Sequence, residues 1–102
     1  MTLRQKQSQF AHMVALLILH AEQLGYSVTF GDCYRDERCA YGSSKSFHKK
    51  RLAVDLNLFR NGYYLRSTEA HRPFGEFWKS IGGSWGGDFL INYGYHYSFG
   101  VV

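Results

Sequence analysis

The first part of the chain is predicted to be one long helix, because its apolar residues recur every three or four positions. This stripe consists of Phe10, Val14, Leu17, Ala21 and Leu24. Thr2 followed by Gln5 matches the capping-box pattern at a helix start, and Gly25 is typical of a position just beyond a helix end. We therefore expect a helix over roughly residues 3–24.

Two later segments alternate apolar and polar residues, which predicts β-strands over residues 26–30 and 52–59. One face of the second strand carries Leu52, Val54, Leu56 and Leu58. The other face carries Ala53, Asp55, Asn57 and Phe59. Asn61-Gly62 is typical of a type I′ hairpin turn, so residues 63–65 should form the return strand.

The rest of the chain predicts a second helix and a last strand. Thr68 and Pro73 predict a loop that leads into a helix containing Phe74, Phe77, Trp78 and Ile81. Residues 95–102 predict a final extended segment, and the polar stretch 31–47 predicts a long loop. We therefore expect residues 1–102 to form a single α+β domain. In it, a long N-terminal helix packs on a small antiparallel sheet, beside a second short helix.

Composition narrows the class of protein. The chain has 102 residues, of which 45% are hydrophobic and 18% aromatic, as in globular proteins. A formal net charge of +4 fits an anionic partner or simply a basic surface, and it decides between neither. Cys33 and Cys39 are not a CxxC pair, so we expect reduced thiols.

No segment has the length of a membrane span, because the longest apolar run is Met13–Leu19. Polar residues flank this run and no small-residue cleavage site follows it, so we interpret it as part of the first helix rather than a signal peptide. We expect synthesis in the cytoplasm without a signal peptide, and no insertion into a membrane.

A metal site is predicted around Asp55, which lies in mid-strand on the face opposite the leucines. His48 comes seven residues earlier, where the loop enters the strand, so the two side chains can converge. A second histidine from the final strand would complete a set of two histidines and one carboxylate, which is a catalytic zinc set with an open position. The spacing alone is weak evidence, because His and Asp often fall this far apart by chance. His12 and His20 are two turns apart on the first helix, so we expect them to be solvent-exposed.

Residues 46–55 read SFHKKRLAVD. They resemble the Ser-x-His-x-x-Gly-x-Ala-x-Asp motif of the zinc D-Ala-D-Ala carboxypeptidases and the phage L-alanyl-D-glutamate endolysins, with four of its five defining residues. Further segments resemble the phage branch of that family in the same order. They are residues 31–35, residues 71–87 with their tryptophan-glycine turn, and residues 95–97.

The resemblance implies a role for several residues. His48, Asp55 and His96 would bind Zn²⁺. Arg35 would hold a carboxylate or carbonyl of the substrate, for which its planar guanidinium is suited. Ser46 is expected on the substrate side, where it would support the loop by hydrogen bonding rather than attack the substrate.

Trp85 lies in a glycine-rich turn. The sequence does not decide whether Trp85 lines the wall of the substrate cleft or packs in the core. At the other tryptophan, Trp78, the helical spacing with Phe74 and Ile81 favours the core.

Two positions depart from the family pattern. Arg51 stands where the motif has glycine, which we expect to alter the turn or the surface charge without harming the metal site. Tyr93 stands where the family has the carboxylate that acts as general base. A tyrosine with an ordinary pKa near 10 is a poor base at neutral pH. Asp88 is the nearest acidic residue, and it is our candidate catalytic base.

The sequence therefore predicts a zinc metallopeptidase acting on peptidoglycan stem peptides, as a D-Ala-D-Ala carboxypeptidase or an L-Ala-D-Glu endopeptidase. An alternative is a catalytically impaired domain of the same fold that binds zinc and cell-wall peptide. A nucleic-acid-binding role is not favoured, because it leaves the His–Asp–His set unexplained. We expect a monomer that reaches the cell wall after release, in a phage or prophage context.

Overall fold

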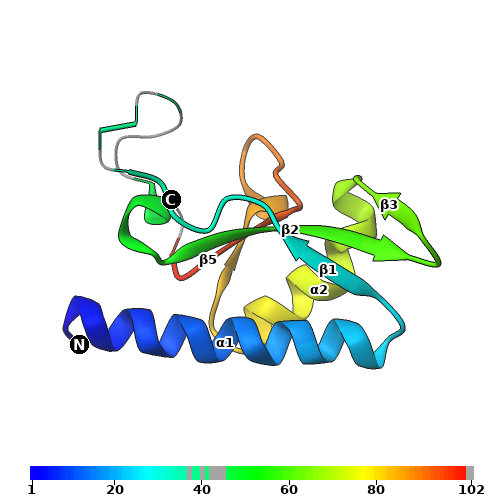
Figure 1. Cartoon of the computed structure of the whole chain (residues 1–102), viewed down its shortest axis with the longest axis horizontal. Helices are drawn as coiled ribbons and strands as arrows, with labels where there is room; N and C mark the ends of the chain where they lie inside the picture. Colours follow the sequence, from blue (N-terminus) through cyan, green and yellow to red (C-terminus); the bar gives the residue numbers. More distant parts are fainter. Residues whose placement is uncertain (37, 40, 42–45, 101–102) are drawn as a thin grey trace.

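The computed structural model describes residues 1–36, 38–39, 41 and 46–100, and they form an α+β fold, as predicted (Figure 1). The two helices are α1 (Leu3–Gln23) and α2 (Thr68–Ser80). The strands are β1 (Ser27–Phe30), β2 (Ala53–Arg60), β3 (Tyr63–Leu65), β4 (Ser84–Trp85) and β5 (His96–Ser98). Two short 3₁₀ helices, η1 (Phe47–Lys50) and η2 (Gly86–Asp88), complete the described elements.

Helix α1 begins and ends where its sequence signals predict. Thr2 and Gln5 form the reciprocal capping box, and Gly25 follows the helix with a φ of 85°, which glycine adopts without strain. Its inward face consists of Phe10, Met13, Leu17 and Ala21. Leu24 is 46% exposed, so its expected place in the buried stripe is wrong, whereas Met13, which the stripe did not include, is buried. His12 is exposed, whereas His20 is partly buried and stacks on Phe77, with ring centroids 4.1 Å apart.

Strand β2 is the centre of the antiparallel sheet. The strand order is β1-β2-β5-β4. Strand β5 pairs with the first residues of β2, and β3 pairs with its last residues. The four apolar residues predicted to share one face are all buried: Leu52, Val54, Leu56 and Leu58. The hairpin after β2 has the predicted turn, with φ of 52° at Asn61 and 81° at Gly62.

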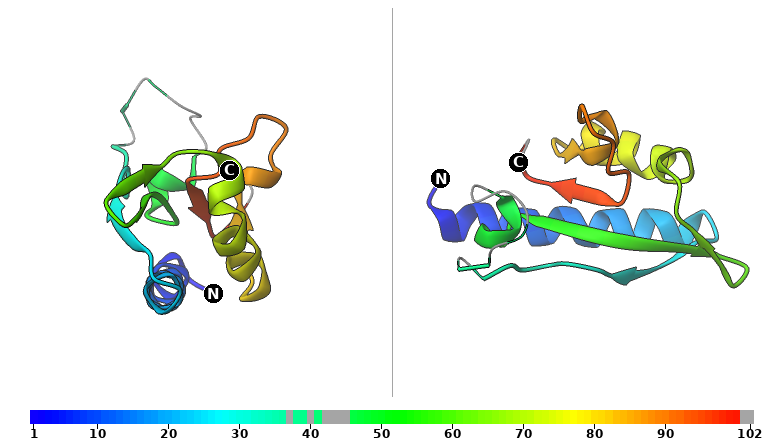
Figure 2. Two further views of the ribbon diagram at one scale, coloured as in Figure 1. Left: turned by 90° about the vertical axis from the view of Figure 1, so that its right-hand side faces the viewer. Right: turned by 90° about the horizontal axis from the view of Figure 1, so that it is seen from above.

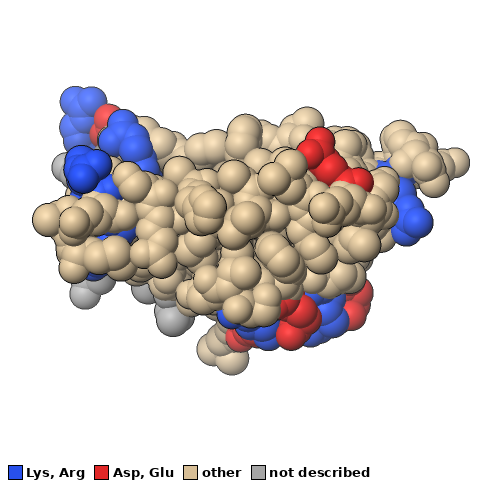
Figure 3. Space-filling view, turned by 90° about the horizontal axis from the view of Figure 1, so that it is seen from below, with Lys and Arg blue, Asp and Glu red and all other residues tan. Residues whose placement is uncertain are grey.

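The apolar face of the sheet is covered by both helices. In the views of Figures 1 and 2, α1 runs along the length of β2, and α2 lies beside it against β4 and β5. Phe10 of α1 meets Trp78 of α2 edge to face, with ring centroids 5.7 Å apart. Among the described residues, no helix combines the length and the apolar character needed to cross a bilayer. Figure 3 shows positive side chains in separate groups on the face that it draws.

The second helix starts earlier than the sequence predicts. Residues 68–73 were expected to form a loop, but α2 begins at Thr68, where the Ser67 hydroxyl accepts a hydrogen bond from Ala70 N–H. Pro73 therefore lies inside the helix and removes one intrahelical hydrogen bond. Complete burial of Phe74 and Trp78 directly after it holds the helix together across this position.

The final strand is shorter than residues 95–102. β5 comprises His96–Ser98, and residues 101–102 lie outside the described residues. Its second neighbour, β4, has only two residues, Ser84 and Trp85. A strand of that length carries no alternation that a sequence pattern could reveal.

Candidate metal centre

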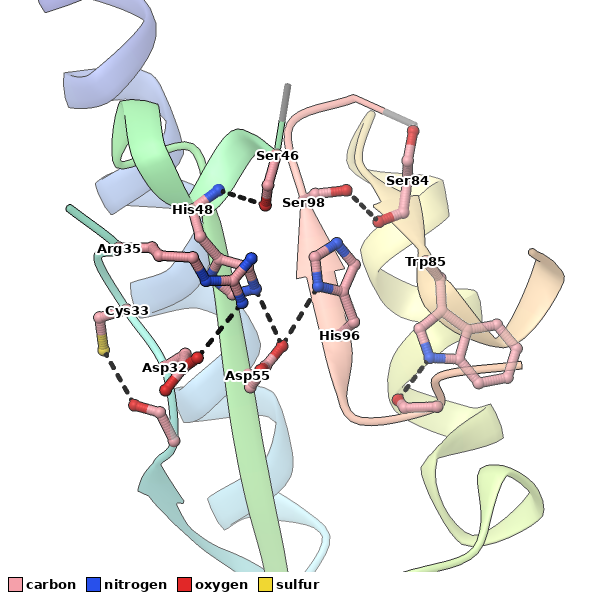
Figure 4. A network of polar contacts seen from close by, with 12 residues as sticks. Asp32, Cys33, Arg35, Ser46, His48, Asp55, Ser84, Trp85, His96 and Ser98 are labelled. Atoms are coloured by element: carbon pink, nitrogen blue, oxygen red, sulfur yellow. Dashed lines mark hydrogen bonds and ion pairs between the residues drawn. The ribbon is translucent and has the colours of Figure 1, made fainter. Parts of the chain in front are cut away.

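The three residues expected to bind a metal meet at one point (Figure 4). His48 comes from η1, Asp55 from β2 and His96 from β5, and one potential ligand atom of each lies within 4.8 Å of the others. Asp55 Oδ1 is 3.3 Å from His48 Nε2 and 3.2 Å from His96 Nδ1. Both histidines are buried and Asp55 is partly buried, so the cluster is largely shielded from solvent.

Strand pairing and a short turn place these side chains. Asp55 lies on the face of β2 opposite the buried leucines and stands directly across from His96 of β5. His48 is held by η1, because the Ser46 hydroxyl accepts a hydrogen bond from its N–H at 3.2 Å. Ser46 is buried and makes the contact expected of a residue that supports the loop. A substrate contact by Ser46 stays a prediction.

The electrostatics of Asp55 favour a charged carboxylate. Burial raises its pKa, but the hydrogen bonds from His48 and His96 outweigh burial and hold the pKa below its ordinary value. Asp55 is therefore ionised at neutral pH and available as an anionic ligand.

The donor set fits a divalent metal ion. Two imidazole nitrogens approach one carboxylate oxygen at 3.2 and 3.3 Å, at the long end of the hydrogen-bond range. The other ring nitrogens, His48 Nδ1 and His96 Nε2, are buried without a hydrogen-bond partner among the described residues. Among the described residues, the side chain of each histidine thus has Asp55 as its only hydrogen-bond partner. Two imidazoles and one carboxylate are the ligand types of a catalytic zinc site with an open position.

A β-bulge brings the segment after β1 to this centre. Gly31 N–H donates to Asp55 O, and Asp55 N–H donates to Asp32 O, each at 2.8 Å. Gly31 and Asp32 therefore both lie opposite Asp55, which is the pattern of a β-bulge. The bulge changes the direction of the chain next to the metal ligands. A Cβ on Gly31 would lie 3.2 Å from Asp55 Cβ, so glycine leaves the ligand its room.

Arg35 lies beside the cluster, as Figure 4 shows. Its main-chain N–H donates to His48 O at 3.1 Å, and its guanidinium binds Asp32 at 3.3 Å and lies over the Tyr41 ring at 4.7 Å. The side chain is only 10% exposed, and its Nε is buried without a hydrogen-bond partner in the part of the chain that the structure describes. The sequence analysis did not identify Asp32 as a partner of Arg35. The available sign was a glycine at the end of a strand directly before it, which often marks a bulge.

The two remaining predicted site residues lie differently. Asp88 belongs to η2, and its carboxylate binds Lys79 Nζ at 2.7 Å, so its role as a base stays a prediction. Trp85 is 1% exposed, and its indole N–H donates to Gly94 O at 2.7 Å. Of the two alternatives for Trp85, the structure shows core packing, and a contact between Trp85 and a substrate stays a prediction.

Tyr93 and Tyr95 lie in the segment that leads into β5, directly before His96. Tyr93 N–H donates to Gly86 O at 2.9 Å, and its carbonyl accepts from His96 N–H at 3.0 Å. The Tyr95 pKa is raised above its ordinary value by burial and by the negative charge of Asp55. The sequence did not identify Tyr95, because the residue before a strand has no defined face.

His71 is not a ligand of the cluster. It is buried in α2, and its Nδ1 is 2.8 Å from the Tyr97 hydroxyl. Its contact with Tyr97 joins α2 to β5 and lies apart from the metal cluster.

Comparison with known proteins identifies a family. Residues 40–98 match the model of a family described as D-alanyl-D-alanine carboxypeptidase. The matched region contains His48, Asp55 and His96, whereas Arg35 lies before it. No curated protein matches the chain.

Proposed function

The chain belongs to the D-alanyl-D-alanine carboxypeptidase family, and from this premise we propose that it is a zinc metallopeptidase acting on the stem peptides of peptidoglycan. The observation that carries the proposal is the convergence of His48, Asp55 and His96 inside the matched region. Family membership by itself implies a peptide substrate.

The proposed roles follow from the geometry. His48, Asp55 and His96 would hold the ion, and a bound zinc supplies a Lewis acid that polarises a carbonyl and acidifies water. The ionised Asp55 brings negative charge to the ligand set. Burial of both histidines keeps the ligands in one arrangement, because their rings have little room to rotate.

Arg35 is proposed to bind the substrate. Its buried Nε–H has no partner among the described residues, and an unpaired buried donor is costly. A carboxylate or carbonyl of the stem peptide would satisfy that donor, and a carboxylate would form the stronger, charge-assisted bond. Asp32 and Tyr41 hold the guanidinium in place beforehand, so little side-chain freedom is lost on binding.

Two peptide bonds fit this site. Cleavage of a terminal D-Ala-D-Ala bond would leave the substrate carboxylate on the leaving residue, where Arg35 could hold it. Cleavage of L-Ala-D-Glu inside the stem would use a carboxylate or carbonyl of the chain instead. Synthetic peptides that contain one bond or the other separate the two activities.

A second candidate function rests on a specific observation. Tyr93 stands where the resembling family has its base, and the nearest carboxylate after β4, Asp88, is bound to Lys79. These contacts favour a domain that binds zinc and cell-wall peptide with impaired catalysis.

Hydrolysis of purified peptidoglycan tests the proposal. We expect release of new amino groups or of free alanine, loss of that release with a chelator, and recovery with added zinc. The matched control is His12→Ala, which removes an exposed histidine of α1 and should behave as the wild type. Zinc-dependent peptide binding without turnover supports the second candidate, and the absence of both binding and turnover contradicts both functions.

The biological setting is also a proposal. The likeness of several segments to phage endolysins supports synthesis in the cytoplasm, followed by action on the wall after release. We propose that the protein acts as a monomer and does not bind nucleic acid. Light scattering of the purified protein checks the oligomeric state.

A further inference from the structure

Arg51, the residue that ends η1, has a backbone conformation that is unusual for its type. Its φ is 57° and its ψ is 38°, in the left-handed region. Among the described non-glycine residues, only Arg51 and Asn61 have a positive φ. Asn61 belongs to a type I′ turn, which requires that conformation and accepts asparagine well. Arginine is strained in this conformation and glycine is not. We therefore look for a contact of the arginine side chain that offsets the strain.

The side chain of Arg51 makes a specific contact. Its guanidinium carbon lies 4.0 Å from the centroid of the Tyr34 ring, the closest contact of this kind among the described residues. A planar guanidinium stacks well on an aromatic face, and a lysine ammonium lacks that plane. Tyr34 directly precedes Arg35, so the contact reaches the segment that carries the proposed substrate-binding residue.

The main chain closes the same connection. The carbonyl oxygen of His48 accepts two hydrogen bonds, from Arg35 N–H at 3.1 Å and from Arg51 N–H at 3.3 Å. One carbonyl of a metal ligand thus joins both arginines, and the stack of Arg51 on Tyr34 joins them a second time. A further hydrogen bond between the same segments runs from Lys49 Nζ to Cys39 O at 3.0 Å.

We propose that Arg51 is a positioning residue, which fixes Arg35 beside the metal ligands by stacking on Tyr34. The inference rests on the proposed function, because it concerns how that site holds its substrate. Arg51 acts through Tyr34 and Arg35 and does not touch the reacting atoms. A stack that only stabilised the fold would change the free energy of unfolding and leave substrate binding unaltered.

The test compares Arg51→Gly with Asn61→Gly. Both changes replace a residue of positive φ by glycine, but Asn61 lies in the hairpin after β2, away from Arg35. For Arg51→Gly we expect unchanged zinc affinity and a midpoint of thermal unfolding equal to or above that of the wild type. We also expect a KM for the stem-peptide substrate raised roughly 2- to 30-fold, the range of a lost cation–π contact, with little change in kcat. Asn61→Gly should leave KM and kcat as they are.

Two further variants sharpen the comparison. Tyr34→Leu removes the other half of the stack and should raise KM by a similar factor, and combining it with Arg51→Gly should add little, since both remove one contact. Arg51→Lys keeps the charge without the plane and should restore only part of the loss.

Hydrogen exchange gives a readout that does not need turnover. The Arg35 N–H is bonded to His48 O, so its exchange should become faster in Arg51→Gly and in Tyr34→Leu, but not in Asn61→Gly. If the wild type hydrolysed no peptide, the proposed function would fail, while faster exchange at Arg35 would still support the positioning role. Unchanged exchange at Arg35 together with an unchanged KM in Arg51→Gly would overturn it, as would equal effects from Asn61→Gly.

Discussion

Asp55 and His96 are 41 positions apart in the sequence and stand directly opposite each other in the pairing of β2 with β5, with Asp55 Oδ1 3.2 Å from His96 Nδ1. The next pair in the register is Val54 with Tyr97, and both side chains are buried. A slip of one residue would bring Val54 or Tyr97 to the solvent face, so packing of the core fixes the register. The geometry of the metal ligands is therefore set by the core beneath them.

His96→Ala should abolish stoichiometric zinc binding, because it removes one of three protein ligands. We expect about one zinc per chain in the wild type and a loss of affinity of at least about a hundredfold in the variant. Elemental analysis and titration calorimetry of protein purified without chelator measure this. His12→Ala is the matched control and should keep its zinc, and a folded wild type that binds no metal would contradict the assignment.

Local signals in the sequence predicted the ends of α1 and the hairpin after β2. Thr2 with Gln5 and Asn61 with Gly62 act through bonds and dihedral angles within a few residues, so no tertiary contact was needed to interpret them. The metal set needed more. His48 and Asp55 are close in the sequence, but only the resemblance of separate segments to one family connected them with His96.

Other features depend on partners that the sequence does not place. Pro73 is tolerated inside α2 because the residues after it are buried against the sheet, a tertiary effect that outweighs the local preference. The bulge at Gly31 exists only because Asp55 lies across from it. Trp85 is in the core through β4, a strand too short to recognise.

Arg35→Ala should spare the metal and weaken substrate binding. Its guanidinium binds Asp32 and Tyr41 rather than the ligands, and the main-chain bond to His48 O does not need the side chain. Loss of a charge-assisted hydrogen bond predicts a KM about ten- to a hundredfold higher. The matched control is Arg38→Ala, because the Arg38 side chain is 90% exposed and, among the described residues, forms an ion pair only with Asp36. Loss of zinc from Arg35→Ala would show that Arg35 supports the metal site instead.

Acid should destabilise the fold through His71. Burial lowers its pKa from 6.5 to about 4, whereas in the unfolded chain it titrates near 6.5. Between these two pKa values, His71 is therefore protonated in the unfolded chain and neutral in the native protein. The contribution to stability is complete above pH of about 6.5 and is lost progressively as the pH falls to about 4, amounting to about 3 kcal/mol.

This loss is measured by denaturant unfolding of metal-free protein at several values of pH between about 7.5 and about 4.5. That range covers most of the interval in which His71 titrates in the unfolded chain but not in the folded one. His71→Gln is the comparison, because glutamine can still hydrogen-bond to the Tyr97 hydroxyl but does not titrate. The variant should lose less stability across this range than the wild type. Parallel profiles of the two proteins would show that His71 does not account for the acid sensitivity.

The proton acceptor of the reaction can be identified by restoring the missing carboxylate. Tyr93 is bonded through its N–H to Gly86 O and through its carbonyl to His96 N–H, so its backbone is fixed next to a metal ligand. Tyr93→Asp places a carboxylate three residues before His96, and these main-chain bonds do not involve the side chain. If no carboxylate now serves, the wild type is slow, and Tyr93→Asp should raise kcat by roughly 10²- to 10⁴-fold. Tyr93→Asn, of the same shape but unable to accept the proton, should not.

Asp88 provides the competing outcome. Its carboxylate is 2.7 Å from Lys79 Nζ, and Lys79 also binds Glu76 at 2.8 Å, so Asp88 would have to leave this network to take up a proton from the attacking water. We therefore expect Asp88→Ala to retain zinc and to change kcat little. A fast wild type that loses most of its rate in Asp88→Ala would instead make Asp88 the base. A fast wild type that keeps its rate in Asp88→Ala and gains nothing from Tyr93→Asp would exclude both positions and leave Glu69 and Glu76 as the next carboxylates to replace.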